Sequence, residues 1–202
     1  MKFLLTSSGL DGENISNEFV KLVGKPANQI KVVVVQMDSK YRSNSYNVNR
    51  LSNQLLNLGI NKKYLKVLVL ETGISYKDII SYDVLMMGDG NSFLLLDHIR
   101  KNAFDKVIKK FITANKIYVG VSSGSYITCP TIEMATWKGS NNKINLKDLT
   151  ALNLIPFLIT AHYDLKYKKI IDTAEKQTTY KVMRLKDRQA IIVTDKETRV
   201  IE

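Results

Sequence analysis

The chain has 202 residues, with 45% hydrophobic and 24% charged side chains, which is close to the average for a soluble globular protein. A chain of this length can bury roughly 70% of its unfolded surface, so we expect a single domain over residues 1–202. The net charge of +11 comes from 30 Lys and Arg against 19 Asp and Glu. These basic residues are scattered in pairs without interleaved aromatic residues, so a nucleic-acid partner is not expected.

Neither a membrane span nor an export signal is expected from this sequence. No run of eighteen apolar residues occurs, and the opening "MKFLLTSSGLDGENIS" turns polar after three large apolar residues. The single cysteine, Cys129, cannot form an internal disulfide, which fits a reducing cytoplasm, and we expect it to be a small buried packing residue.

Short apolar runs alternate along the chain with longer segments of helical period. The runs predict strands over residues 2–7, 30–36, 65–71, 83–88 and 116–122. The segments between them predict helices over residues 14–23, 45–59, 76–81 and 91–115. This alternation indicates an α/β fold, a doubly wound, mainly parallel sheet with helices on both faces, in which ligands bind at the carboxyl ends of the strands.

The last third of the chain is less regular. Residues 149–160 are an apolar run interrupted by Pro156, and residues 163–178 have a helical pattern. Short strands are expected over 180–185, 189–194 and 198–202, joined by the polar turns "KDR" and "DKE".

A candidate nucleophile lies at the end of the strand predicted at 116–122. Gly120-Val121-Ser122-Ser123-Gly124 is a G-x-S-x-G pattern between a strand and the start of a helix. Glycines allow the sharp turn that presents a serine oxygen above a sheet, and the N–H groups at the helix start can stabilise an oxyanion. Ser122 is therefore the candidate nucleophile; the alternative is a serine that only caps the helix.

A serine nucleophile needs a base, and the sequence offers two histidines. His98 lies inside a predicted amphipathic helix, where a structural role is expected, whereas His162 follows an apolar run and can face the elbow at a strand end. We assign the base to His162. Gly90, in the turn "GDGNS", is the candidate second oxyanion donor, while Asn91 is positioned either to cap the next helix or to contact substrate.

The sequence resembles the peptidase E family, the aspartyl dipeptidase-like serine peptidases, whose fold is similar to that of class I glutamine amidotransferases. The resemblance covers nearly the whole chain through "FLLTSSG", "GDGNSFLLL", "YVGVSSGSYITCPTI", "ALNLIPFLITAHYD" and "LKDRQAIIV", of which the last looks structural. It implies Ser122 as nucleophile, His162 as base, and the backbone N–H groups of Gly90 and Ser123 as the oxyanion hole, with no metal or cofactor.

Three positions depart from the family pattern. Trp137 occupies the place of the family's triad Asp, about fifteen residues after the serine, and leaves Glu133 as the nearby carboxylate that could orient His162. A backbone carbonyl or a distant acid could take that role instead. Asp89 replaces the first glycine of the oxyanion turn. Residues 163–177 contain lysines but no arginine, so strict Asp-X specificity is not expected, and Lys166 or Lys168 would attract acidic substrates more loosely.

Two functions from different classes remain. The first is a serine hydrolase that cleaves short peptides and works as a monomer or homodimer. The alternative is a non-catalytic or weakly active relative that binds a small ligand or a partner, which Trp137 and Asp89 favour. An amidotransferase-like enzyme would need a cysteine at the elbow, and Cys129 lies seven residues later.

Overall fold

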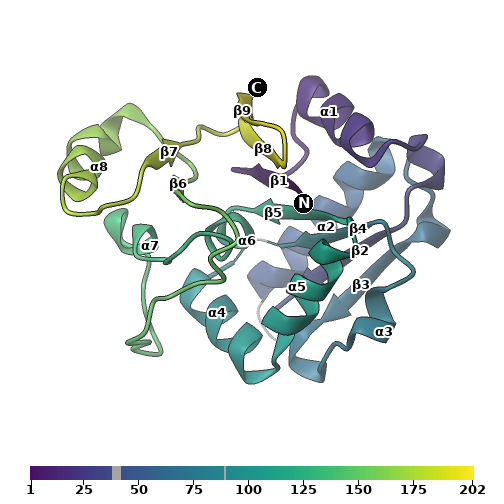
Figure 1. The fold of residues 1–202 in the computed structure, drawn as a ribbon, viewed down its shortest axis with the longest axis horizontal. Helices are drawn as coiled ribbons and strands as arrows, with labels where there is room; N and C mark the ends of the chain where they lie inside the picture. Colours follow the sequence, from purple (N-terminus) through teal and green to yellow (C-terminus); the bar gives the residue numbers. More distant parts are fainter. Residues whose placement is uncertain (38–41, 89) are drawn as a thin grey trace.

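The computed structural model describes residues 1–37, 42–88 and 90–202, with the backbone alone for 42–47. Its centre is a seven-stranded sheet in the order β3-β2-β4-β5-β1-β8-β9 (Figure 1). The strands of this sheet are β1 (Lys2–Thr6), β2 (Val32–Gln36), β3 (Leu65–Val69), β4 (Val84–Met87), β5 (Ile117–Val121), β8 (Ala190–Thr194) and β9 (Thr198–Ile201).

Five strands run parallel, and β8 and β9 join them antiparallel at the β1 side. The described helices are α1 (Glu13–Val23), α2 (Arg42–Asn57), α3 (Tyr76–Ile79), α4 (Ser92–Lys101), α5 (Phe104–Thr113), α6 (Ser123–Tyr126), α7 (Met134–Trp137) and α8 (Lys168–Glu175). The predicted α/β class with a mainly parallel sheet is confirmed.

The core lies on both faces of this sheet because successive side chains of a strand point in opposite directions. On β2, the fully buried Val32 and Val34 belong to the core that packs under α1 and α2. Val33 and Val35 belong to the opposite core, which contains the apolar faces of α3, α4 and α5. Burial on both faces explains why the central strands are nearly continuous apolar runs.

The structure differs from the sequence-based prediction in two segments. The helix expected over 91–115 is two helices, α4 and α5, because Ala103 between them has a left-handed backbone with φ 50°. The apolar run at 149–160 ends in a short strand, β6 (Leu158–Thr160), which pairs in parallel with β7 (Val182–Arg184) in a separate two-stranded sheet.

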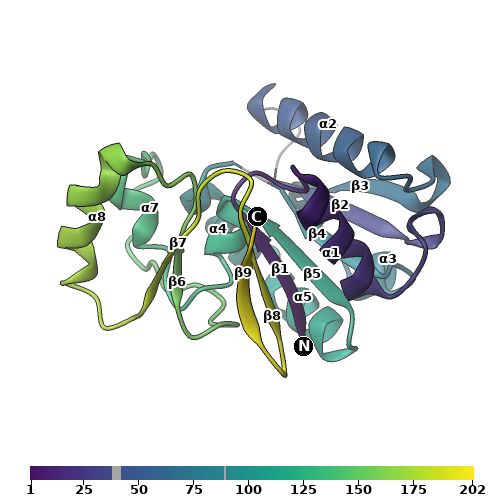
Figure 2. The same cartoon turned by 90° about the horizontal axis from the view of Figure 1, so that it is seen from above.

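This small sheet, together with α7 and α8, lies at one side of the molecule, next to the β8 side of the large sheet (Figures 1 and 2). Backbone hydrogen bonds connect its two chain segments beyond the strands: Leu185 N–H donates to Thr160 and Tyr163 N–H donates to Leu185. The segments that follow β6 and β7 are therefore held side by side, close to the carboxyl ends of β1 and β5. Among the described residues, no helix combines the length and apolar character needed to cross a membrane.

Candidate active site

The segment after β5 has the strained geometry expected of a nucleophile elbow. Ser122 has φ 51° and ψ −107°, a conformation that L-residues rarely adopt. Its two flanking glycines are required by close packing: a Cβ on Gly120 would lie 2.6 Å from the Gly124 carbonyl oxygen, and one on Gly124 would lie 2.3 Å from the Met87 carbonyl oxygen. The glycines therefore let the elbow pack directly against β4, with Ser122 at the carboxyl end of the sheet.

The imidazole of His162 contacts this serine. His162 Nε2 lies 3.1 Å from Ser122 Oγ, within hydrogen-bond distance, although 40 residues separate the two in sequence. His162 follows β6 and has a left-handed backbone with φ 53°. The segment is held by Ala161, whose N–H donates to the Tyr126 hydroxyl at 3.0 Å and whose carbonyl accepts from the Lys138 ammonium.

The other ring nitrogen of His162 contacts a carboxylate. His162 Nδ1 lies 2.5 Å from Asp187 Oδ1, and a proton on Nδ1 would leave Nε2 free to accept the proton of Ser122. Partial burial opposes ionisation of Asp187, but hydrogen bonds from the Ser7 hydroxyl and from His162, and electrostatic attraction to His162 and the Lys138 ammonium, bring its pKa below the usual value. Asp187 is thus a carboxylate placed to fix the imidazole tautomer.

Two expectations about the acid need correction. Glu133 does not orient His162: it lies at the start of α7, and its buried Oε1 atom has no hydrogen-bond partner among the described residues. The turn that contains Asp187 does not have a purely structural role, because it supplies the carboxylate at His162. Trp137 packs against the apolar core. The carboxylate that lies beside His162 therefore belongs to a different part of the chain than the family pattern implied.

The residues expected to form the oxyanion hole lie beside the elbow. Ser123 is the first residue of α6, directly after the nucleophile, and Gly90 lies between β4 and α4 with φ 152°. Since β4 and β5 are adjacent parallel strands, both residues lie at the carboxyl edge of the sheet. Asp89, expected to affect this turn, lies outside the described residues.

Of the two roles expected for Asn91, the structure shows the helix cap. Its side-chain oxygen accepts hydrogen bonds from the N–H groups of Phe93 and Leu94, both at 3.1 Å, which caps α4. Its side-chain nitrogen donates to the Asn141 carbonyl at 2.8 Å. The amide is therefore used to hold the start of α4 and the segment around residue 141.

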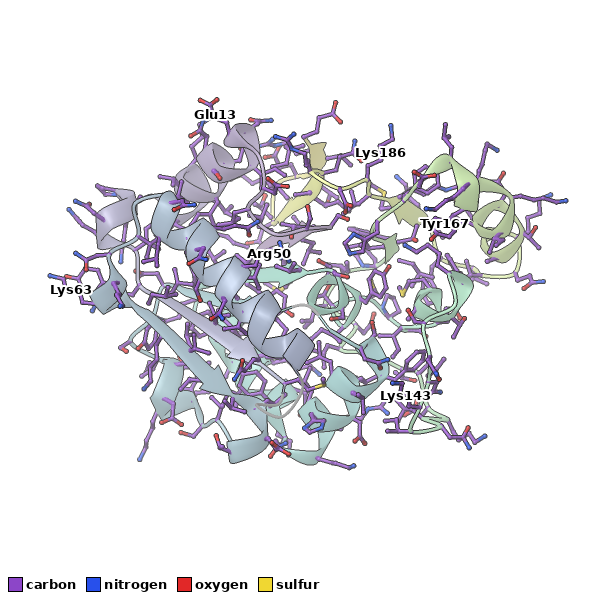
Figure 3. All side chains as sticks on the ribbon, turned by 180° about the vertical axis from the view of Figure 1, so that it is seen from behind. Glu13, Arg50, Lys63, Lys143, Tyr167 and Lys186 are labelled. Carbon is purple, nitrogen blue, oxygen red and sulfur yellow. The ribbon has the colours of Figure 1, made fainter. Side chains whose placement is uncertain are left out.

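An open pocket of about 670 Å³ adjoins His162 and Asp187. Lys166 and Lys186 contribute positive charges to its lining, which also contains Tyr163, Asp164, Leu165 and Tyr167. Figure 3 labels Lys186 and Tyr167, which come from the β7–β8 connection and the segment before α8. Lys168, the other lysine considered for acidic substrates, is paired with Asp172 at 2.6 Å.

Cys129 is fully buried, as expected, and burial raises the pKa of its thiol to about 12. Such a thiol stays protonated and is a poor nucleophile at neutral pH. In the part of the chain that the structure describes, no cluster of three or more His, Cys, Asp or Glu residues could hold a metal ion. The side chains that the structure brings together at this site are those of Ser122, His162 and Asp187.

Comparison with known proteins identifies the family of this chain. The model of peptidase family S51 matches residues 3–201. An uncharacterized peptidase of Pasteurella multocida (strain Pm70) is 33% identical over 125 residues, which cover 59% of this chain and 59% of that relative. An uncharacterized peptidase of Listeria monocytogenes serovar 1/2a is 28% identical over 201 residues, covering 96% of this chain and 94% of the relative.

The fold also matches a solved structure. It is the crystal structure of a Listeria monocytogenes EGD-e protein that is provisionally described as peptidase E. The two structures superpose with a TM-score of 0.80 at 24% sequence identity, and the superposition covers 100% of this chain and 98% of the Listeria chain. At this identity the likeness establishes the fold. The family model matches nearly the whole sequence and therefore shows the family: the chain belongs to peptidase family S51.

Proposed function

We propose that the protein is a serine hydrolase that cleaves short peptides through an acyl-enzyme on Ser122. The observation that carries the proposal is the continuous chain of contacts from Ser122 Oγ to His162 Nε2 at 3.1 Å and from His162 Nδ1 to Asp187 Oδ1 at 2.5 Å. This is the arrangement by which an imidazole removes the proton of a serine hydroxyl while a carboxylate holds the correct tautomer.

In the proposed reaction, Ser122 Oγ attacks the carbonyl carbon of the scissile bond as its proton moves to His162 Nε2. The negative charge that develops on the substrate oxygen is stabilised by the N–H groups of Gly90 and Ser123. Collapse of this intermediate breaks the C–N bond, and the proton on Nε2 passes to the leaving amine. A water molecule then repeats the sequence on the ester, which releases the acid and restores Ser122.

The pocket beside the triad supports a loose preference for acidic substrates. Lys166 is a candidate contact because its ammonium lies over the Tyr167 ring, 5.1 Å from the centroid, at the pocket wall. The arginine of β7, Arg184, is instead paired with Asp172 at 2.7 Å and with Glu175. A lysine binds a carboxylate as a point charge and lacks the two-pronged geometry of arginine, so we propose weak discrimination rather than strict Asp-X specificity.

Peptide hydrolysis tests the proposal. The wild-type chain, Ser122→Ala and Lys166→Gln are incubated with matched dipeptides and tripeptides that carry either Asp or Asn at the first position, and products are identified by mass spectrometry. Support would be cleavage by wild type that disappears in Ser122→Ala, with a reduced Asp preference in Lys166→Gln. Cleavage that persists in Ser122→Ala, or no cleavage of any peptide, contradicts the peptidase and favours the non-catalytic binding protein.

A further inference from the structure

The carboxyl end of β1 connects the nucleophile elbow with the loop that carries Asp187. In the sheet, β1 lies between β5 and β8. Its last residue, Thr6, accepts a hydrogen bond from the N–H of Ser122 at 3.0 Å. On the other side, Ser7 N–H donates to the Gln189 carbonyl at 3.1 Å, and the Ser8 hydroxyl accepts from Arg188 N–H at 3.2 Å.

The Ser7 side chain reaches further into the site than these backbone contacts. Ser7 is fully buried, and its hydroxyl donates to Asp187 Oδ1 at 2.9 Å. The same oxygen of Ser7 accepts the backbone N–H of His162 at 2.8 Å and lies 3.5 Å from His162 Nδ1. A hydroxyl has one proton to donate, so this bond to Asp187 uses it, while the amide of His162 occupies one of its two lone pairs.

We propose that Ser7 is a positioning residue of the triad, which fixes the base and the acid to each other and to the rigid end of β1. This inference rests on the proposed function. Both partners need such a support, because they lie on loops at the surface: the side chain of His162 is 44% exposed and that of Asp187 is 61% exposed. Without Ser7, the carboxylate would have fewer constraints against turning toward water.

The charge state of Asp187 agrees with this role. Burial opposes its ionisation, and the next largest influence is the hydrogen bond from Ser7, which favours the charged carboxylate and lowers its pKa. Hydrogen bonds to charged groups are among the stronger ones in proteins. Loss of one such bond corresponds to about a tenfold to hundredfold change in rate if its effect is expressed in the reaction.

The experiment compares Ser7→Ala with a matched control, Ser8→Ala, in the full chain. The Ser8 hydroxyl accepts the N–H of Arg188, next to Asp187, but among the described residues it makes no hydrogen bond to Asp187 or His162, so its loss should leave the triad in place. The rate of inactivation by a fluorophosphonate probe is measured for both variants, for Asp187→Asn and for the double variant Ser7→Ala/Asp187→Asn. Thermal unfolding verifies that each variant is folded.

A second readout does not depend on turnover. The chain has two histidines, so a His98→Gln background leaves His162 as the source of any imidazole signal in proton NMR. A hydrogen bond as short as that from His162 Nδ1 to Asp187 gives a proton resonance far downfield. We expect Ser7→Ala to shift or broaden this resonance and Ser8→Ala to preserve it.

Support would be inactivation of Ser7→Ala slowed by about tenfold to hundredfold, with little further loss when Ser7→Ala is added to Asp187→Asn, because both changes remove the same interaction. Inactivation of Ser7→Ala at the wild-type rate with an unchanged resonance would overturn the proposal. So would a double variant whose loss of rate equals the product of the losses in Ser7→Ala and Asp187→Asn. Failure of the probe to label wild type would count against the hydrolase, and the resonance would still decide whether Ser7 positions the His–Asp pair.

Discussion

Replacement of Asp187 by asparagine tests the acid that the structure assigns to His162. The change removes one negative charge next to Nδ1, where the two atoms lie 2.5 Å apart, and nearly preserves the size of the side chain. Two effects follow. The imidazole loses the carboxylate that holds its proton on Nδ1, and the imidazolium formed during attack by Ser122 loses a neighbouring opposite charge.

The magnitude follows from the exposure of the pair. Opposite charges about 4 Å apart attract by ~1 kcal/mol in water and ~4 kcal/mol at the effective dielectric constant near a protein surface. Because the Asp187 side chain is 61% exposed, its contribution lies within this range. These energies correspond to rate losses of about fivefold to a thousandfold, below the roughly ten-thousandfold loss known for a buried triad aspartate.

The assay is the second-order rate of inactivation by a fluorophosphonate, measured for Asp187→Asn beside two matched controls. Asp164→Asn removes a carboxylate from the same pocket, where it accepts the Lys166 N–H at 2.9 Å. Glu133→Gln removes the acid that the sequence suggested. We expect a large loss in Asp187→Asn alone. A wild-type rate in Asp187→Asn, or an equal loss in Glu133→Gln, would refute the assignment.

Three further outcomes are expected. Gly124→Ala should destabilise the fold by ~1–3 kcal/mol or more in chemical denaturation, because its Cβ would lie 2.3 Å from the Met87 carbonyl oxygen. Gly88→Ala should cost less, because its Cβ would lie 3.4 Å from the Val35 carbonyl oxygen, and equal losses would contradict this account. Cys129 should resist alkylation at pH 8 until the protein unfolds, since burial raises its pKa to about 12, and rapid alkylation of the folded chain would contradict its burial. The pKa of Asp187 is lowered in the folded state, so its carboxylate should add to the free energy of unfolding of wild type relative to Asp187→Asn. This advantage should be full above about pH 4 and should decline as the pH falls through the folded-state pKa. An advantage that grows on acidification would contradict the lowered pKa.

The elbow could be predicted from the sequence because its chemistry is local. A strand, two glycines and a serine within five residues impose the turn, and the contacts of Gly120 and Gly124 show why a side chain is excluded at both. His162 could be chosen because only two histidines were available and one lay within a helix. Its position at the end of a strand was inferred correctly, although β6 itself was not recognised within its apolar run.

Asp187 could not be identified in the same way, because its role depends on contacts between distant segments. The turn "KDR" reads as an ordinary solvated connection, and a carboxylate in such a turn is most often exposed. Its place beside His162 results from β8 pairing antiparallel with β1, which brings the preceding loop to the end of β1. The break between α4 and α5 was missed for a related reason: Ala103 adopts a left-handed backbone without the glycine that usually marks it.

The most direct test of the central claim is to locate the covalent adduct. Wild-type protein is treated with a fluorophosphonate, digested, and sequenced by mass spectrometry, with Ser122→Ala and His162→Ala treated in parallel. If Ser122 is the activated nucleophile, the adduct lies on Ser122 in wild type, is absent from Ser122→Ala and is strongly reduced in His162→Ala. A folded wild-type chain that gains no adduct at high probe concentration, or an adduct that remains in Ser122→Ala, would contradict the claim.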